Sequence, residues 1–450
     1  MLSEFSESEG LTQRWLQLAL LTLAMGMVFA VLLLLLRTPW LVQILPVRDW
    51  FSWALVLHVD LSIVGWYCAF AGFFISLLLP ESGVSIGRFA YRGSVLGVLF
   101  MLLAVLDTSA QPMLNNYFPV IDSTIFYIGL SALLFSTLLS FLRLRQRIAF
   151  AGCLVEWVLL AALWVGAVAL ITTVIAWFSM STYAHGDYYF ELLFWGGGHL
   201  FQAMYTLIMC AAWLWLSGEG GLQLPSSSGV VIKLLVAVVA LGATATLSTS
   251  YFGVDTYVYR HSYTLFMMYV SWLPVPVVAY RVIHSALGSY RAGDGAGVFV
   301  VVSVVLFFIG LFVGALIRDD SLIVPAHYHA TTAGINLAFF AVIYRQLLGR
   351  EAFRPLVARV LAYFFGVLLL VVGLGWGGVQ RMPRKVAGLQ QWESLSQQLS
   401  LALVVVGGGL LWWLLSQYWD IFSVFWENQA VLLFLSLKRL QNVKHVMIKS

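Results

Sequence analysis

Long apolar runs, separated by short polar segments, occupy most of the chain. Each run is close to the roughly 20 residues that an α-helix needs to cross a bilayer, and longer than the about 9–11 residues of a barrel strand. Lipid offers no partners to backbone N–H and C=O groups, so helices are the structure that fits these runs. The pattern predicts an all-α integral membrane protein with a bundle of twelve transmembrane helices. The expected spans are 14–37, 51–79, 90–107, 122–143, 151–178, 189–216, 229–248, 261–288, 297–317, 322–348, 357–379 and 398–427.

The composition agrees with this interpretation. Of the 450 residues, 61% are hydrophobic and only 10% are charged, whereas soluble domains carry roughly 25% charged residues. The segments between the expected spans are too short for a separate soluble domain, so residues 1–450 are expected to form a single transmembrane domain. The net charge of +4 comes from basic residues in the loops and does not indicate a nucleic-acid partner.

The positions of lysine and arginine set the expected orientation. With both termini in the cytoplasm, sixteen of the 24 basic residues fall on the cytoplasmic side and seven on the outer side. This bias follows the positive-inside rule and predicts a protein of a bacterial-type inner (cytoplasmic) membrane. The first ten residues, MLSEFSESEG, are acidic and polar, so the first apolar run is expected to stay in the mature chain rather than to be a cleaved signal peptide.

Five of the eight histidines fall at one expected depth. His58, His199, His261, His327 and His329 belong to four different spans, all in the outer third of the membrane. An ionisable ring in a span is costly and as a rule faces the bundle interior. A single such ring is more often a hydrogen-bonded interior histidine, whereas five at a common depth favour metal or haem ligation.

His327 and His329 stand two residues apart in VPAHYHATTAG. On a helix, side chains at i and i+2 project about 200° apart, so the two rings are expected to serve separate centres on opposite faces. A haem with two axial protein ligands is an electron carrier, and a haem with one leaves a face open for a substrate. His58 is the expected second ligand of one of the two haems.

At these residues the chain resembles the catalytic subunit I of the haem–copper oxidase superfamily, which contains the cytochrome oxidases and the nitric oxide reductases. AHYHATTAG is similar to the family's AHFHY segment, and the resemblance covers essentially the whole chain. It implies that His327 holds a high-spin, substrate-reducing haem. It also implies that His58 and His329 hold a low-spin haem, of b or a type.

Further segments on the outer side resemble the same family. QRMPRK is similar to the family's GMPRR, whose basic pair binds haem propionates; here the pair is Arg384 and Lys385. Asp320 falls where the family carries an acid near the propionates, and QPMLNNYFPV is similar to a P-x-x-NN loop of the oxidase branch. An ordinary solvated loop is the alternative for the basic pair, but basic residues are rare on this side and a guanidinium suits a carboxylate.

The chain departs from the family at the second metal, which is copper in the oxidases and non-haem iron in many nitric oxide reductases. In the family, one ligand histidine is followed by an adjacent pair of histidines on a later span. WGGGHLFQAMY supplies His199 for the first, and in YRHSYT Arg260 replaces the first histidine of the pair while His261 matches the second. A fixed positive charge beside a dication is repulsive. Either Gln202 completes the metal site or the metal is absent, and the catalytic set that the resemblance implies is His327, His199, His261, Gln202 and Arg260.

Three functions remain open. Oxygen-reducing members carry a tyrosine four residues after the first metal-binding histidine, where this chain has Ala203, and the lysine of their proton channel is missing from the eighth span. Reduction of nitric oxide to nitrous oxide needs neither group, so a nitric oxide reductase without proton pumping is the favoured expectation. The alternatives are an oxygen-reducing terminal oxidase with an atypical active site, and a degenerate subunit that carries haem for electron transfer without catalysis.

The source of electrons is expected to be another protein. The chain contains neither a CxxCH haem-attachment motif nor a CxxxC copper motif. A cytochrome c or a copper-centre protein on the outer face, in a membrane complex with this chain, is the expected donor, with a quinol as the alternative.

Overall fold

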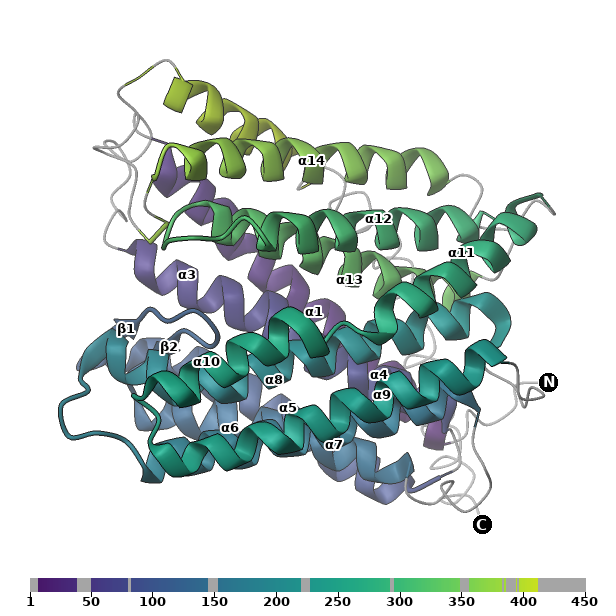
Figure 1. Cartoon of the computed structure of the whole chain (residues 1–450), viewed down its shortest axis with the longest axis horizontal. Helices are drawn as coiled ribbons and strands as arrows, with labels where there is room; N and C mark the ends of the chain where they lie inside the picture. Colours follow the sequence, from purple (N-terminus) through teal and green to yellow (C-terminus); the bar gives the residue numbers. More distant parts are fainter. Residues whose placement is uncertain are drawn as a thin grey trace, which may run out of the picture.

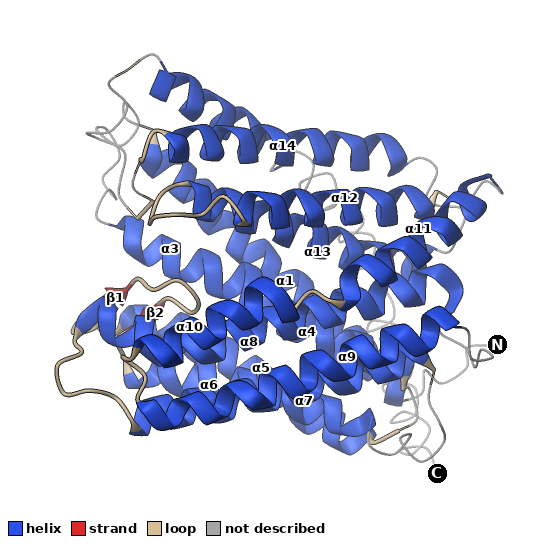
Figure 2. Cartoon of the chain, in the orientation of Figure 1, coloured by secondary structure: helices blue, strands red, loops and turns tan. Residues whose placement is uncertain are grey.

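The computed structural model describes residues 7–38, 50–79, 82–144, 153–219, 227–291, 295–348, 356–382, 384–385, 394 and 396–411. Helices form nearly all of this part of the chain (Figures 1 and 2). The α-helices are α1 (Glu7–Arg37), α3 (Phe51–Val59), α4 (Trp66–Leu78), α5 (Val84–Leu103), α6 (Thr124–Phe141), α7 (Leu154–Phe178), α8 (Gly186–Leu214), α9 (Ser227–Thr246), α10 (Tyr257–Leu265), α11 (Pro274–Arg291), α12 (Ala296–Gly314), α13 (Ile323–Leu348) and α14 (Val357–Val379).

Short irregular elements interrupt or extend these helices. Strands β1 (Pro112–Met113) and β2 (Val120–Ile121) form an antiparallel pair in the loop between α5 and α6. A π-helical turn, Asp60–Gly65, joins α3 to α4, so that the second span is one continuous helix with a local widening. Such π-turns are rare and often occur at functional sites.

The prediction of an all-α membrane bundle is confirmed. Ten helical segments of the described residues are long and apolar enough to cross a membrane, and their ends lie within six residues of the expected spans. The third span shows the largest difference, because its helix begins at Val84, in a polar stretch with two arginines that hydropathy places outside. The tenth expected span coincides with α13, and the twelfth is described only over Ser396–Leu411. Both chain termini lie outside the described residues.

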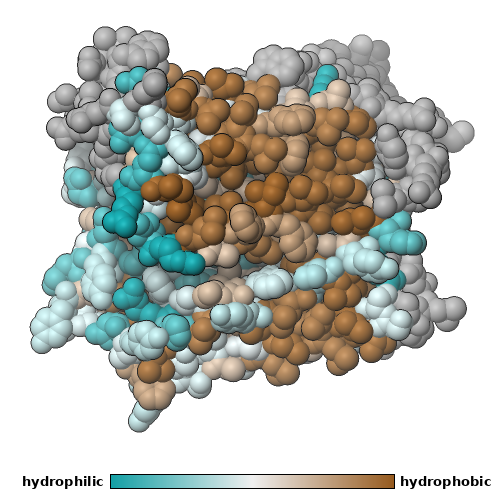
Figure 3. Space-filling model, turned by 45° about the horizontal axis from the view of Figure 1, so that its top comes forward, coloured by the Kyte–Doolittle hydropathy of each residue, from teal (hydrophilic) through white to brown (hydrophobic). Residues whose placement is uncertain are grey.

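The helices run side by side along a common direction (Figure 1). In that view α14 and the helix Ser396–Leu411 lie at one edge and α7 and α9 at the other, with α1, α8 and α13 between them. The β1–β2 pair lies at the same end of the bundle as the start of α3. Figure 3 shows a broad apolar face on which polar residues gather at that end, as expected for a surface that lies in lipid.

Glycines allow neighbouring helices to approach closely. A Cβ atom at Gly97 of α5 would lie 2.7 Å from the carbonyl oxygen of Gly129, and one at Gly129 of α6 would lie 2.7 Å from that of Gly97. Lipid tails are as apolar as the side chains between helices, so close van der Waals contact through small residues holds such pairs together.

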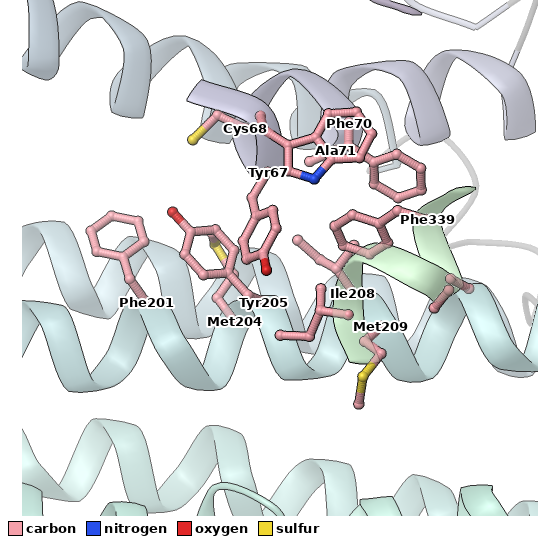
Figure 4. Packing of buried hydrophobic residues seen from close by; sticks show 14 of the residues in the cluster. Tyr67, Cys68, Phe70, Ala71, Phe201, Met204, Tyr205, Ile208, Met209 and Phe339 are labelled. Atoms are coloured by element: carbon pink, nitrogen blue, oxygen red, sulfur yellow. The ribbon is translucent and has the colours of Figure 1, made fainter. Parts of the chain in front are cut away.

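Aromatic rings fasten α4 to α8 and α13 (Figure 4). The rings of Phe70 and Phe339 stack with centroids 3.7 Å apart and planes 8° apart. Tyr67 meets Tyr205 edge to face, with centroids 4.9 Å apart. Because α4 continues α3 through the π-turn, these contacts also fix α3 relative to α13.

Candidate functional site

A cavity of about 230 Å³ lies between α1, α3, α13, α14 and the helix Ser396–Leu411. Its walls are mostly apolar, but two imidazoles, of His58 and His329, and one guanidinium, of Arg37, line it as well. Ligand sites are commonly of this kind, apolar with a few convergent polar groups.

Each of the two imidazoles is oriented by a backbone carbonyl. Nδ1 of His58 lies 3.0 Å from the oxygen of Gly26 in α1, and Nδ1 of His329 lies 2.7 Å from the oxygen of Pro325 in its own helix. A carbonyl oxygen only accepts hydrogen bonds, so each Nδ1 carries the proton and each Nε2 keeps its lone pair. Two such nitrogens on one cavity could ligate a haem iron from both sides, with the second-shell bonds that metal-binding histidines usually have.

The close approach of α1 to the second span places the Gly26 carbonyl. A Cβ atom at Gly26 would lie 2.7 Å from Cβ of Ser62, so only glycine fits at this crossing. Ser62 belongs to the π-turn and donates its hydroxyl to the carbonyl of His58 at 2.5 Å. Near the cavity, Nε1 of Trp66 donates to Oδ1 of Asn336 at 2.9 Å and ties α4 to α13.

Asp60 begins the π-turn and is fully buried. Neither of its carboxyl oxygens has a hydrogen-bond partner among the described residues. A buried polar group without a partner costs about 1–3 kcal/mol. Asp60 is not among the residues that line the cavity.

His327 lies on the other face of α13. Its Nδ1 is 2.7 Å from the carbonyl oxygen of Gly310 in α12, so its Nε2 is also left with a lone pair. A Cβ atom at Gly314 would lie 2.6 Å from the same ring, which shows how closely the imidazole packs on α12. The structure therefore separates His327 from His329, as the spacing of two residues predicts.

Charged and amide side chains gather at the end of the cavity nearest the loop that carries β1 and β2. Arg384 is buried, forms an ion pair with Asp320 and donates to the side chain of Asn116. The guanidinium of Arg37 donates to the carbonyl of Arg384. Nζ of Lys385 donates to the carbonyl of Leu114 at 3.0 Å, and burial, followed by the nearby Arg384 charge, lowers the pKa of Lys385.

The loop that carries β1 and β2 is fastened across this end of the bundle. The carboxylate of Glu191 accepts the backbone N–H of Asn116 at 2.9 Å and its side-chain amide at 2.6 Å. Asp187, one turn earlier on α8, accepts the N–H of Leu114 at 2.7 Å. The NN segment of the P-x-x-NN loop thus bridges α8 and the basic pair.

His199 lies under this loop, on α8. Its Nδ1 is 2.6 Å from the carbonyl oxygen of Trp195, and its Nε2 is 3.3 Å from the hydroxyl of Tyr117. The ring of Tyr117 lies with its centroid 4.8 Å from that of the imidazole, against Gly198. Burial raises the pKa of Tyr117, so the phenol stays protonated at neutral pH and donates to Nε2.

The other residues predicted for the second metal do not join His199. The ring of His261 stacks on Tyr257 at 4.7 Å, on a face of α10 other than the one from which Tyr263 reaches His199. Gln202 is exposed. Within the described part of the chain, no group of three or more His, Cys, Asp and Glu side chains could hold a metal ion. These residues do not fit a second metal in the arrangement seen here.

Several residues of the site are absent from the set predicted by sequence. Arg37 belongs to no motif, Tyr117 follows the two asparagines of QPMLNNYFPV without being singled out, and Gly26 is one of 38 glycines. Asp60 could have been identified from the sequence, since an acid inside a span is a candidate functional residue by its position alone. Arg37 carries a weaker one, a charge in the last turn of an apolar helix on the side where basic residues are rare.

No family model matches the chain. It is similar to an uncharacterised protein of Rickettsia prowazekii (strain Madrid E), with 23% identity over 90% of this chain and 93% of the relative. It is also similar to an uncharacterised protein of Aquifex aeolicus (strain VF5), with 27% identity over 78% of this chain and 90% of the relative. These similarities span the bundle, and neither name states an activity.

Proposed function

We propose that this chain is a haem-binding oxidoreductase subunit with twelve transmembrane helices, in which His58 and His329 ligate a low-spin haem. The observation that carries the proposal is that both imidazoles line one cavity with Nδ1 bound to a carbonyl and Nε2 left as a ligand. A haem of b or a type held in this way supplies a one-electron redox centre.

The surrounding residues have distinct roles in this proposal. The carbonyls of Gly26 and Pro325 orient the two imidazoles and raise their basicity as ligands. Arg37 lines the cavity at its outer end and is the cation best placed to receive a propionate. Arg384 already serves Asp320 and Asn116, so its role, with Lys385, is to hold the outer wall in place.

Electrons enter from the outer side in this proposal. His58 is the eighth residue of the second span, which begins at Phe51, and His329 is the seventh residue of α13. Both spans begin on the side that the orientation proposed above makes the outer one. A cytochrome c or copper-centre subunit docked on that face of an inner-membrane complex is the proposed donor.

We further propose that His327 holds a high-spin haem at which nitric oxide is reduced, according to 2 NO + 2 H⁺ + 2 e⁻ → N₂O + H₂O, without proton pumping. Support comes from the separation of His327 from His329 on α13. An oxygen reductase is less well supported, because Ala203 is buried where a tyrosine is needed and Tyr205 packs against Tyr67 instead.

A second candidate function is electron transfer without substrate chemistry. It is favoured by the fact that His199 and His261 contact different rings, and by the positive charge of Arg260 beside them. In that case the chain would pass electrons within a larger complex.

Absorbance spectra of the purified complex test these proposals, with iron and copper quantified on the same sample. A low-spin reduced-minus-oxidised signal supports the haem proposal, and its absence would overturn it. A second haem whose spectrum shifts with CO, and loses that shift in His327→Ala, supports substrate reduction, and NO and O₂ turnover then identify the substrate. No CO shift leaves electron transfer as the function.

A further inference from the structure

Arg260 is a cation near the outer end of α10 that no carboxylate neutralises. Its Cζ atom lies over the ring of Trp195, 4.6 Å from the centroid, and its Nε is buried without a hydrogen-bond partner. Within the described part of the chain no acid is within ion-pair distance of it. An arginine at the end of a span ordinarily extends outwards to water, whereas Arg260 folds inwards over Trp195.

The side chains in contact with this guanidinium carry no negative charge, and the nearby carboxylate of Glu191 binds Asn116 instead. Trp195 donates its Nε1–H to the carbonyl of Arg260 at 3.0 Å, and Tyr117 lies with its ring 5.7 Å from Trp195. His199 is a neutral acceptor that Tyr117 already occupies. Glu191, one turn before Trp195, has both oxygens bound by Asn116.

A partly buried charge without a partner is unfavourable, and an anion relieves it. The guanidinium is planar and presents its N–H groups in the geometry that a carboxylate-like ion accepts. Its packing on Trp195 fixes that plane before any ligand arrives. A single guanidinium matches the charge of a monovalent anion.

We infer that Arg260, on Trp195 and beside Tyr117, forms a binding site for a planar, monovalent oxyanion of the carboxylate class. The anion is taken from the outer side. The resemblance implies a metal cation at this place. The proposed ligand has the opposite charge. It is independent of the haem proposal, because none of its residues lines the cavity of His58 and His329.

The test uses formate as the probe, with chloride at equal ionic strength as the reference. The apparent Kd for formate is measured by ¹³C-formate NMR, and the thermal unfolding midpoint is followed in the same buffers. Four forms of the full chain are compared: the unchanged protein, Arg260→Gln, Arg260→Lys and Arg318→Gln. Arg318 is the matched control, since it is an exposed arginine at the outer end of another helix that contacts only backbone carbonyls.

We expect formate to bind the unchanged protein and Arg318→Gln, and to raise their unfolding midpoints. Arg260→Gln should raise the apparent Kd at least tenfold, and without formate its midpoint should equal or exceed that of the unchanged protein. Arg260→Lys keeps the positive charge but loses the paired N–H groups of the guanidinium, so it should bind formate more weakly than the unchanged protein. This comparison tests the site even if the glutamine variant does not fold. Formate binding that is absent, or equal in Arg260→Gln and the unchanged protein, would overturn the inference.

Discussion

His58 and His329 come from different helices to one cavity, and each has Nδ1 on a backbone carbonyl, 3.0 Å from the oxygen of Gly26 and 2.7 Å from that of Pro325. Both bonds assign the ring proton to the nitrogen that faces the protein, which prepares the other nitrogen for a metal. The same holds for His327 on Gly310. These three imidazoles are the ones on which the proposed haem ligation rests.

Replacing either cavity histidine should remove the low-spin haem. In His58→Ala or His329→Ala one axial ligand is lost, so we expect the low-spin band to disappear and the haem content to fall by up to half. The measurement is a reduced-minus-oxidised spectrum together with iron per chain. The control is His284→Ala, since His284 is an exposed residue of α11. Unchanged spectra in both cavity variants would exclude the proposed ligand pair.

Gly26→Ala should weaken the site without touching a ligand. The added Cβ would lie 2.7 Å from the backbone N and the Cβ of Ser62, so α1 must move away and carry its carbonyl from His58. Overpacking of this kind costs about 1–3 kcal/mol, and we expect a lower unfolding midpoint and faster haem loss. Gly375→Ala is the control, because nothing lies within 4 Å of a Cβ there. Equal haem retention in both variants would contradict the role given to the Gly26 carbonyl.

Asp60→Ala should stabilise the protein. The change removes two buried oxygens that have no partner among the described residues, and the gain of about 1–3 kcal/mol exceeds the loss of packing from so small a side chain. The comparison is Asp187→Ala, which removes the acceptor of the Leu114 N–H bond and should be destabilising. The measurement is the thermal unfolding midpoint of both variants. If Asp60→Ala were the less stable of the two, Asp60 would have a partner that the fold alone does not supply.

Acid should loosen the loop that carries β1 and β2. Asp107 accepts bonds from the Ser109 hydroxyl, the Ser123 hydroxyl and the Ser109 N–H, which lower its pKa below the usual 3.8. Because the pKa in the folded state is the lower one, these bonds are fully present above pH 3.8 and are lost as the pH falls through the lowered pKa. We expect hydrogen exchange of the 109–123 amides, corrected for intrinsic rates, to accelerate below pH 3.8. In Ser123→Ala, where one bond is already missing, the acceleration should begin at higher pH.

The bundle and the division of its histidines follow from the sequence because both depend on local periodicity. A run of about 20 apolar residues must be a helix in lipid, whatever it packs against. The opposite faces of His327 and His329 depend only on the helical repeat. The third span is expected to begin at residue 90 because hydropathy detects only apolar residues. Residues 84–92 include two arginines, so hydropathy leaves the start of α5 outside the span although it is helical.

The partners of those histidines depend on which helices touch, and the sequence does not specify this. The Gly26 carbonyl reaches His58 across 32 residues, and the Tyr117 hydroxyl reaches His199 across 82. The π-turn at Asp60–Gly65 arises where α1 crosses at Gly26 and leaves no mark in the apolar pattern. The sequence places His261 at the same depth as His199 and so predicts that the two rings meet. In the structure the ring of His261 stacks on Tyr257 instead, because depth along a helix does not determine which face a side chain is on.

The walls of the cavity are synthesised at different times. Asn336 lines the cavity and accepts the bond from Trp66 beside it, although the two residues are 270 positions apart. A ribosome adding about 5–20 residues per second needs roughly 15–50 s to make Asn336 after Trp66. During that interval α1 and α3 stand in the bilayer with the first half of the cavity open and the opposite wall not yet made. If His58 and His329 ligate a haem as proposed, a haem delivered early would find one axial ligand of two, and loading would succeed only after α13 has been inserted. On that proposal, cells that make this protein need its last helices to be inserted before the haem is delivered.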